Sequence, residues 1–571
     1  MRPVRRTTRQ VLTLVVATAT LTAPLAAQSG RTPAPARNGM VVSNHYLASE
    51  AGRDVLKAGG NAIDAAVATA FALAVTLPSA GNIGGGGFIV YHPAAGAPTT
   101  FNFRETAPAA ATERMFLGPD GEVRDDSNHE GLLAVGVPGT VAGLWAAHQK
   151  YGRLPWARLV QPAITLAERG FPSTWDMQGI QRTFRDMAAQ WPSSARAFLK
   201  NGTDLYEPGE TWRQPDLART LKRIQRQGRD GFYKGETAKL IADFMRAHGG
   251  LITEADLAAY EAVEQPPVRG TYRGYEVIGM APPSSGGVAI IEMLNILEGY
   301  NLTALGHNSA ISLHLMTEAM RRAFLDRARH LGDPAFNPAM PIERLTSKAY
   351  AAELRAGIDP YRATPSQPSQ VEQADESEET THLSVVDAEG GAVSLTYTLE
   401  YSYGSRIVVE GAGFLLNNEM GDFNAIPGRT DSTGTIGTRP NLVQPGKRML
   451  SSMAPMILAR DGQPVMVIGS PGGRTIINTV LQVILNVVDH GMNIAQAIEA
   501  PRMHHQWLPD ETRIEALGFS PDTRRLYEAM GHRVDTRSSQ GHAMGIFIDR
   551  ERKLLFGGAD SRAFDARAVG W

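Results

Sequence analysis

The sequence predicts a mixed α/β (α+β) fold, in which a long helix-rich part is followed by a strand-rich part. Helix-like spacing of apolar residues, broken by glycines, begins near Val41 and dominates residues 140 to 360. After residue 380 the pattern changes to short strands. Residues 361 to 379, between the two parts, form a polar stretch with two prolines, a composition that seldom packs.

The overall composition is that of a globular protein with a substantial core. The 571 residues are 43% hydrophobic and 20% charged. The formal net charge of −2 gives no basic field for nucleic acid. The absence of cysteine excludes a thiol nucleophile, a disulfide framework and thiolate metal ligands.

The first 27 residues have the pattern of a secretory signal. Four arginines precede a short apolar run, residues 11 to 23, and small residues follow it. This run is shorter than the roughly 20 residues that span a membrane. We therefore expect cleavage near Ala27 and a periplasmic or secreted protein. An uncleaved signal anchor is the alternative.

Individual elements follow from local patterns. "FIVYHP", residues 88 to 93, predicts a strand. Residues 312 to 331 predict an amphipathic helix with a shared apolar face made of Leu313, Met316, Met320, Phe324 and Leu325. Residues 474 to 491 predict a second long helix. In the strand-rich part we expect strands at 382–387, 392–399, 406–409, 454–460 and 464–469.

The first two of these strands are expected to form a hairpin. A three-residue loop, Ala388 to Gly390, would place glycine in the left-handed position. His382 then lies opposite Thr396, and Thr380 opposite Thr398, with side chains on the same face. Threonine also favours ordinary strands, so this pairing alone is more typical of a structural sheet than of a catalytic site.

Ten short motifs carry a resemblance to a known family. They are "LKAGGNAIDAAVA", "GNIGGGGFIVYH", "FRETAP", "GVPGTVAG", "APPSSGG", "TTHLSVVDAEGGAVSLTYTLE", "LLNNEMGDF", "SSMAP", "GSPGGRTIINTVLQ" and "APRMHHQWLPDE". In this order they resemble the γ-glutamyltranspeptidase family of the N-terminal nucleophile hydrolase superfamily. The resemblance implies a four-layer αββα sandwich. It also implies a precursor that cuts itself between Glu379 and Thr380, giving a signal (1–27), a large subunit (28–379) and a small subunit (380–571).

The resemblance implies catalysis by the new N-terminal threonine. The Thr380 hydroxyl would be the nucleophile, and its freed α-amine, with an ordinary pKa of about 7.7 to 8.0, would be the base. Thr398 would support that hydroxyl. Gly472 and Gly473 precede a helix pattern, where backbone N–H groups can hold an oxyanion, although by themselves they are equally typical of a strand-to-helix turn.

The substrate residues are assigned by the same resemblance. Arg104 would grip the α-carboxylate of a γ-glutamyl donor, with hydroxyls from Ser451 and Ser452. The α-ammonium would be bound by three acids, Glu400, Glu419 and Asp422. Some relatives carry asparagine at the first of these positions and glutamine at the second, so this subsite is expected to be more negative here.

The expected function is that of an exported γ-glutamyltransferase and glutathione hydrolase with no cofactor and no metal. Its partners would be small γ-glutamyl donors such as glutathione and amino acid or peptide acceptors, and its two subunits would form a heterodimer. His504 and His505 are adjacent, a spacing that rarely chelates one ion, so we interpret them as structural. The alternatives are a cephalosporin (glutaryl) acylase of the same fold and a non-catalytic exported binding protein.

One segment near the expected site has the composition of a mobile surface loop. Residues 423 to 450 are rich in glycine, serine, threonine and proline, with no aromatic after Phe423. Because Asp422 and Ser451 flank it, we expect a loose lid that becomes ordered when a γ-glutamyl ligand binds. A simple connector is the alternative.

Overall fold

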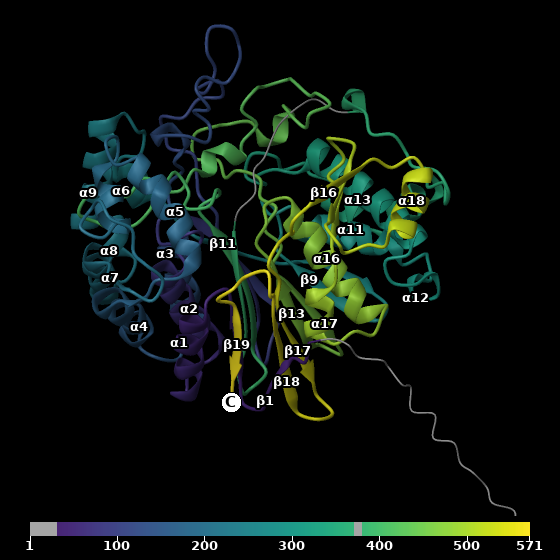
Figure 1. The fold of residues 1–571 in the computed structure, drawn as a ribbon, viewed down its shortest axis with the longest axis horizontal. Coiled ribbons are helices and arrows are strands. Elements are labelled where there is room, and N and C mark those ends of the chain that lie inside the picture. Colours follow the sequence, from purple (N-terminus) through teal and green to yellow (C-terminus); the bar gives the residue numbers. More distant parts are fainter. Residues whose placement is uncertain (1–30, 371–379) are drawn as a thin grey trace, which may run out of the picture.

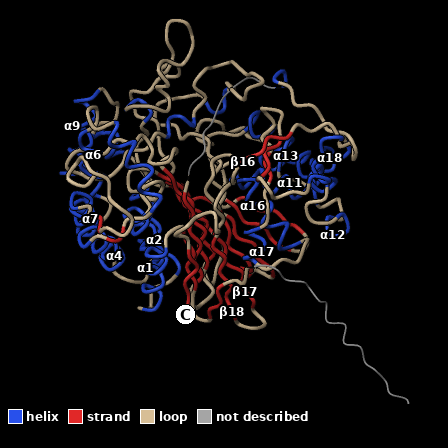
Figure 2. The backbone as a smooth tube through the Cα atoms, viewed as in Figure 1, coloured by secondary structure: helices blue, strands red, loops and turns tan. Residues whose placement is uncertain are grey.

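The computed structural model, drawn in Figure 1, describes residues 31–370 and 380–571. The predicted signal and the acidic run before Thr380 therefore lie outside the described residues. Two seven-stranded sheets occupy the centre of the molecule, with helices on either side of them, as the red and blue segments of Figure 2 show. The predicted four-layer αββα arrangement is confirmed.

The two sheets have the following strand orders. The first contains β1 (Ala34–Ala36), β18 (Leu554–Ala559), β17 (Met544–Asp549), β13 (Gln463–Gly469), β12 (Met456–Arg460), β9 (Tyr275–Gly279) and β8 (Val268–Tyr272). The second contains β19 (Arg567–Gly570), β2 (Met40–Ser43), β10 (Thr381–Val386), β11 (Ala392–Thr398), β3 (Gly86–His92), β4 (Thr99–Phe103) and β7 (Val263–Gln265). Both sheets therefore combine strands from before and after residue 380.

The helices fall into two groups. On the left of Figure 1 lie α1 (Tyr46–Lys57), α2 (Ala62–Thr76), α3 (Thr140–Tyr151), α4 (Trp156–Arg169), α5 (Trp175–Asp186), α6 (Pro192–Phe198), α7 (Pro215–Gln227), α8 (Asp230–Tyr233) and α9 (Gly235–His248), with α10 (Glu254–Ala259) following in sequence. The other group contains α11 (Gly286–Leu297), α12 (Leu302–Leu305), α13 (Ala310–His330), α14 (Ile342–Leu345), α15 (Lys348–Ala356), α16 (Thr475–Val488), α17 (Ile494–Glu499) and α18 (Pro521–Ala529). Two small sheets, β5 (Phe171–Pro172) with β6 (Thr211–Trp212), and β14 (Met503–His504), β15 (Thr512–Glu515) and β16 (Val534–Arg537), complete the described strands.

Alternation along β10 explains how the layers pack. Leu383 and Val385 belong to the core shared with the left-hand helices. On the opposite face, the Ser384 hydroxyl donates to the carbonyl of Met544 in β17 at 3.0 Å. In β11, the Ser394 hydroxyl likewise donates to the carbonyl of Ile468 in β13 at 3.0 Å. Serine hydroxyls thus tie the central sheets together, while apolar side chains hold the helices.

The predicted hairpin is confirmed, including its register. His382 lies opposite Thr396, and the pairing runs from Thr381 opposite Tyr397 to Val386 opposite Ala392. Gly390 has the predicted left-handed backbone, with φ +90°. The close approach of a neighbouring strand explains part of the "GGGG" motif, because a Cβ on Gly85 would lie 1.9 Å from the Thr398 carbonyl.

Two parts of the strand prediction need correction. Residues 406–409 form only one isolated bridge rather than a strand. Their backbone is satisfied instead by serine side chains, since the Val408 N–H donates to Ser194 Oγ at 3.0 Å and the Val408 carbonyl accepts from Ser193 Oγ at 2.8 Å. The hairpin of β8 and β9 was not predicted, because it lies within a region that reads mostly as helix.

Candidate active site

The predicted site residues come together where several strands end. One cavity is lined by nine of the ten, namely Arg104, Thr380, Thr398, Glu400, Glu419, Asp422, Ser451, Ser452 and Gly473. The tenth, Gly472, lines an adjoining cavity. The shared cavity has a volume of only about 20 Å³, roughly the room that one water molecule needs. Thr380 also lines a larger cavity, of about 290 Å³.

The two threonines of the hairpin lie at this end of the sheet. Thr380 directly precedes β10 and Thr398 ends β11, and they are 5% and 3% exposed. The Thr398 hydroxyl accepts a hydrogen bond from the N–H of Glu400 at 2.8 Å. Glu400 has a left-handed backbone, with φ +85°, which is unusual for a residue other than glycine. The bond from its N–H to Thr398 therefore helps to hold the turn that brings Glu400 to the cavity.

Arg104 follows β4, and its guanidinium is fully buried among carboxylates. Its Nη1 lies 2.5 Å from Glu419 Oε2 and 3.5 Å from Glu105 Oε2. Its Nη2 donates to Asp422 Oδ2. Burial by itself lowers the pKa of Arg104, but the three carboxylates outweigh burial and raise this pKa. The arginine is therefore charged, and the residues predicted to bind opposite ends of a substrate bond one another here.

Two of these acids are strongly shifted toward their protonated form. Burial raises the pKa of Glu105 to about 8, although Arg104 acts in the opposite direction. Burial also raises the pKa of Glu419 well above its usual range. Glu105 was missed by the sequence interpretation, because an arginine followed by a glutamate is typical of a surface pair. The preceding apolar strand, "TTFNF", is the signal that could have placed it inside.

Glu400 has a partner that no motif indicated. The Nδ1 atom of His129 lies 3.1 Å from Glu400 Oε1. The His129 ring stacks on Tyr401, with centroids 4.9 Å apart and planes 8° apart. His129 is 8% exposed and comes from an irregular segment before α3, so nothing in its local sequence distinguishes it.

The "APPSSGG" motif holds the two serines in place. The carbonyl of Ser451 accepts from the Ser285 hydroxyl at 2.7 Å, and the N–H of Ser451 donates to the Pro283 carbonyl at 2.8 Å. Arg327 of α13 donates from Nη2 to Ser452 Oγ at 3.2 Å and from Nε to Ser285 Oγ at 2.8 Å. Arg327 is thus a second buried arginine beside the cavity, which the sequence interpretation missed.

Gly472 and Gly473 form the turn between β13 and α16. Their φ angles of +125° and +51° favour glycine. Within residues 31–370 and 380–571, no backbone carbonyl accepts a hydrogen bond from either amide. The turn thus offers two N–H groups at the start of a helix, the arrangement expected of an oxyanion site.

Comparison with known proteins identifies the family. The family model described as gamma-glutamyltranspeptidase matches residues 48–570. The chain belongs to the γ-glutamyltranspeptidase family. It is 46% identical to the "Glutathione hydrolase proenzyme" of Escherichia coli, over 94% of this chain and 93% of that protein.

The chain is also similar to proteins that are named as acylases. The chain is 42% identical to "Acylase ACY 1 proenzyme" of a Pseudomonas species, over 82% of this chain and 83% of that protein. The crystal structure of cephalosporin acylase from Bacillus halodurans has a TM-score of 0.83 and 29% identity, covering 97% of this chain and 99% of that one. This member of the γ-glutamyltranspeptidase family is therefore similar both to proteins named as glutathione hydrolases and to proteins named as acylases.

Residues 423 to 450, which the sequence predicts to be a loose lid, are held in place by hydrogen bonds from side chains. The side-chain amide of Asn441 donates to the Asp422 carbonyl at 2.6 Å, and that of Asn424 donates to the Thr438 carbonyl at 2.6 Å. The N–H of Leu450 donates to the side chain of Asn441 at 2.8 Å. Asparagine side chains thus hold the segment by hydrogen bonds, since it has few apolar residues that could pack. Ordering on ligand binding stays a prediction.

His504 and His505, which the sequence analysis interprets as structural, both contact polar groups of the protein. His504 contacts Asn478 Nδ2 at 2.7 Å and Gln506 Oε1 at 2.8 Å, and burial lowers its pKa to about 3. His505 Nε2 lies 3.2 Å from Asp510 Oδ1. A separate buried group of possible metal ligands consists of His314, Glu318 and His532. Within it, the two histidine rings bond each other at 2.8 Å.

None of the described helices combines the length and the apolar character that crossing a membrane requires.

Proposed function

We propose that this protein is an exported γ-glutamyltransferase and glutathione hydrolase that uses Thr380 as its nucleophile. The observation that carries the proposal is a cavity in which Thr380 meets one buried arginine and three acids. The relative named "Glutathione hydrolase proenzyme" supports both the activity and synthesis as a precursor. Donors would be glutathione-like γ-glutamyl compounds, acceptors would be water, amino acids or peptides, and no cofactor or metal takes part.

The first step would be self-cleavage. The Thr380 hydroxyl attacks the carbonyl carbon of Glu379, the C–N bond breaks, and the nitrogen takes up the hydroxyl proton. Water then hydrolyses the ester, leaving a carboxylate on Glu379 and a free α-amine on Thr380. After removal of residues 1–27 in the periplasm or outside the cell, segments 28–379 and 380–571 would stay together as a heterodimer.

The second step would be acyl transfer. The freed α-amine accepts the proton of the Thr380 hydroxyl as its oxygen bonds to the γ-carbonyl carbon of the donor. The amides of Gly472 and Gly473 bind the oxyanion. As the C–N bond of the donor breaks, the leaving nitrogen takes the proton from the α-amine. Water or an acceptor amine then attacks the ester and regenerates the Thr380 hydroxyl.

The charges in the cavity favour a donor that carries an ammonium group. Arg104 contacts Glu105, Glu419 and Asp422, and Glu400 also lines the cavity. An incoming α-ammonium adds a cation to this acid-rich site, while the α-carboxylate replaces an acid beside Arg104 and reaches the serine hydroxyls. A glutaryl group would bring only the carboxylate and no compensating cation.

The similarity to acylases makes the second candidate a cephalosporin or glutaryl acylase. The two functions are separated by measuring kcat/KM for γ-glutamyl-p-nitroanilide and glutaryl-p-nitroanilide, which differ only in the α-amine. We expect the γ-glutamyl compound to be preferred by a factor of about 100 or more, since only its ammonium can donate charge-assisted hydrogen bonds to the acids of the site, which together contribute about 3 kcal/mol. Equal turnover, or preference for the glutaryl compound, would reassign the protein as an acylase.

Thr398 offers a test of how the turn supports catalysis. In Thr398→Ala the N–H of Glu400 loses its hydroxyl acceptor, so both self-cleavage and turnover of the γ-glutamyl anilide should slow by about tenfold. Thr398→Ser keeps the hydroxyl and should recover most of the rate. A time course on a denaturing gel and steady-state kinetics give the two rates. Normal values for both in the alanine variant would remove Thr398 from the site.

A further inference from the structure

One histidine contacts both of the turns that carry the acids of the small cavity. Glu400 lies on the turn after β11, and the other two acids lie on the 3₁₀ helix η3 (Glu419–Asp422). His129, from the irregular segment between β4 and α3, touches Tyr401 on the first turn and Gly421 on the second. His129 does not itself line the small cavity, so it can act on a bound donor only through these acids.

The backbone of His129 is fixed to the two turns by a single side-chain amide. The carbonyl of His129 accepts from Asn418 Nδ2 at 3.2 Å. The Oδ1 atom of the same amide accepts from the N–H of Tyr401 at 3.1 Å. Asn418 is fully buried and directly precedes η3. The loop of His129 therefore cannot shift without disturbing both of the acid-bearing turns.

The ring of His129 is held on two sides. It stacks on Tyr401 with nearly parallel planes. It also lies so close to Gly421 that a Cβ added there would be 2.2 Å from His129 Nδ1, so the missing side chain of this glycine leaves room for the ring. In this position Nδ1 is 3.1 Å from Glu400 Oε1. The ring thus restrains the carboxylate of a residue whose own backbone is in the unusual left-handed region.

We propose that His129 is a positioning residue for donor specificity, which holds the Glu400 carboxylate where it meets the α-ammonium of the donor. The proposal rests on the proposed function. With its proton on Nδ1, the imidazole binds one carboxylate oxygen and leaves the other for the ligand. A carboxylate that is already oriented loses less side-chain entropy when the ammonium binds, so donors with an α-amine bind more tightly. A donor without an α-amine gains nothing from this arrangement.

Two substitutions separate the ring of His129 from its nitrogen. His129→Phe keeps a flat ring to stack on Tyr401 but has no N–H, whereas His129→Asn keeps an N–H near the position of Nδ1 and gives up the stack. In His129→Phe, KM for γ-glutamyl-p-nitroanilide should rise about tenfold, the size expected for one charge-assisted hydrogen bond, while kcat should change by less than about threefold. In His129→Asn, KM should stay within about threefold of the unmodified value.

Competitive inhibitors report the same contact without turnover. L-Glutamate and glutarate differ only in the α-amine, and both are measured against the γ-glutamyl anilide. His129→Phe should raise the inhibition constant of L-glutamate by about tenfold and leave that of glutarate unchanged. If the phenylalanine variant does not fold, as judged by self-cleavage on a gel, His129→Ala is measured in its place with the same expectation.

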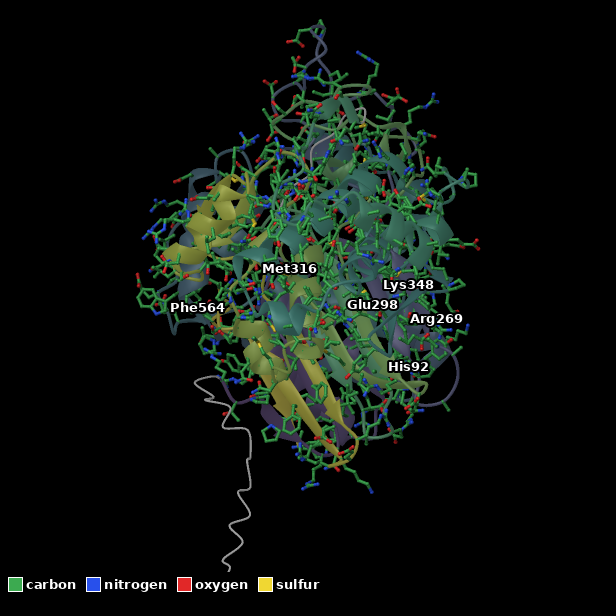
Figure 3. All side chains as sticks on the ribbon, turned by 90° about the vertical axis from the view of Figure 1, so that its right-hand side faces the viewer. His92, Arg269, Glu298, Met316, Lys348 and Phe564 are labelled. Carbon is green, nitrogen blue, oxygen red and sulfur yellow. The ribbon has the colours of Figure 1, made fainter. Side chains whose placement is uncertain are left out.

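Two further variants are controls. Glu130→Gln changes the next residue of the same loop, where the Glu130 side chain is 44% exposed and pairs with Arg406. Lys348→Gln, at the start of α15 in the other group of helices, breaks an exposed pair with Glu298, and both of these residues are labelled in Figure 3. Both controls should leave KM for the anilide and the ratio of the two inhibition constants unchanged.

The outcomes distinguish the role of His129 from the proposed function. An unchanged KM in His129→Phe, equal changes for L-glutamate and glutarate, or a His129→Asn enzyme as impaired as His129→Phe would overturn the role of His129. If the unmodified enzyme did not turn over the γ-glutamyl anilide at all, the proposed function itself would fail, which is a different result.

Discussion

Thr380→Ala is expected to remain one uncut chain and to have no measurable turnover of a γ-glutamyl anilide. A single hydroxyl would serve both as the attacking group in self-cleavage and as the acyl carrier, and alanine removes it from both steps. Loss of the nucleophile in enzymes of this kind costs several orders of magnitude in kcat. Mass spectrometry of the purified protein reports the cut, and steady-state kinetics report turnover.

The neighbouring threonine provides the matched control. Thr381 is buried, and its hydroxyl donates to Asn44 Oδ1 at 3.2 Å. Thr381→Ala should lose about 1 kcal/mol of stability and still cut itself before residue 380. Thr380→Ser should keep part of both functions. If Thr380→Ala still splits, or if Thr381→Ala is the variant that does not, the nucleophile has been assigned to the wrong residue.

Arg104→Lys is expected to raise KM for the γ-glutamyl anilide by tenfold or more. The guanidinium contacts Glu419 through Nη1 and Asp422 through Nη2, and a lysine ammonium cannot reproduce this fork. Loss of one charge-assisted bond, at about 1.5 to 3 kcal/mol, accounts for a factor of that size. Self-cleavage on a gel serves as the control for folding, because it needs Thr380 but not the donor.

The result for Arg104→Lys separates two roles. A rise in KM with self-cleavage intact supports donor binding. An unchanged KM in a cut, folded enzyme would show that Arg104 serves only to neutralise the buried acids. If Arg104→Lys does not fold, Asp422→Asn can be measured instead. This variant leaves Glu419 in place as the partner of Arg104 and should also raise KM for the ammonium-bearing donor.

The hairpin and the glycine turn of the site could be predicted from local sequence, whereas the roles of the substrate residues came from the family resemblance. The three-residue loop ending at Gly390 sets the register of the hairpin, and that register brings Thr380 and Thr398 to the same end of the sheet. The glycines at 472 and 473 similarly indicate a turn before a helix. Such features are determined within a few residues, so a single chain is enough to recognise them.

The residues that could not be predicted depend on contacts between distant segments. His129 reaches Glu400 from an irregular loop, and Arg327 reaches Ser452 from α13. Glu105 is buried only because β4 carries it inward beside Arg104. The false strand at 406–409 has the same origin, since serines 215 and 214 residues earlier in the chain bond to the backbone of Val408. Local sequence patterns do not indicate which side chain from a distant segment will contact a given residue.

The way the two halves share their sheets has a consequence for the lifetime of a cut protein. In one sheet the hairpin of β10 and β11 lies between β2 and β3, so strands from after residue 380 are paired on both sides with strands from before it. Pulling the two fragments apart would require breaking whole ladders of backbone hydrogen bonds and opening both hydrophobic cores. The fragments would thus come apart only by unfolding, and dilution would not separate them. Separately produced fragments, for the same reason, would have no finished partner to dock onto and would have to fold together.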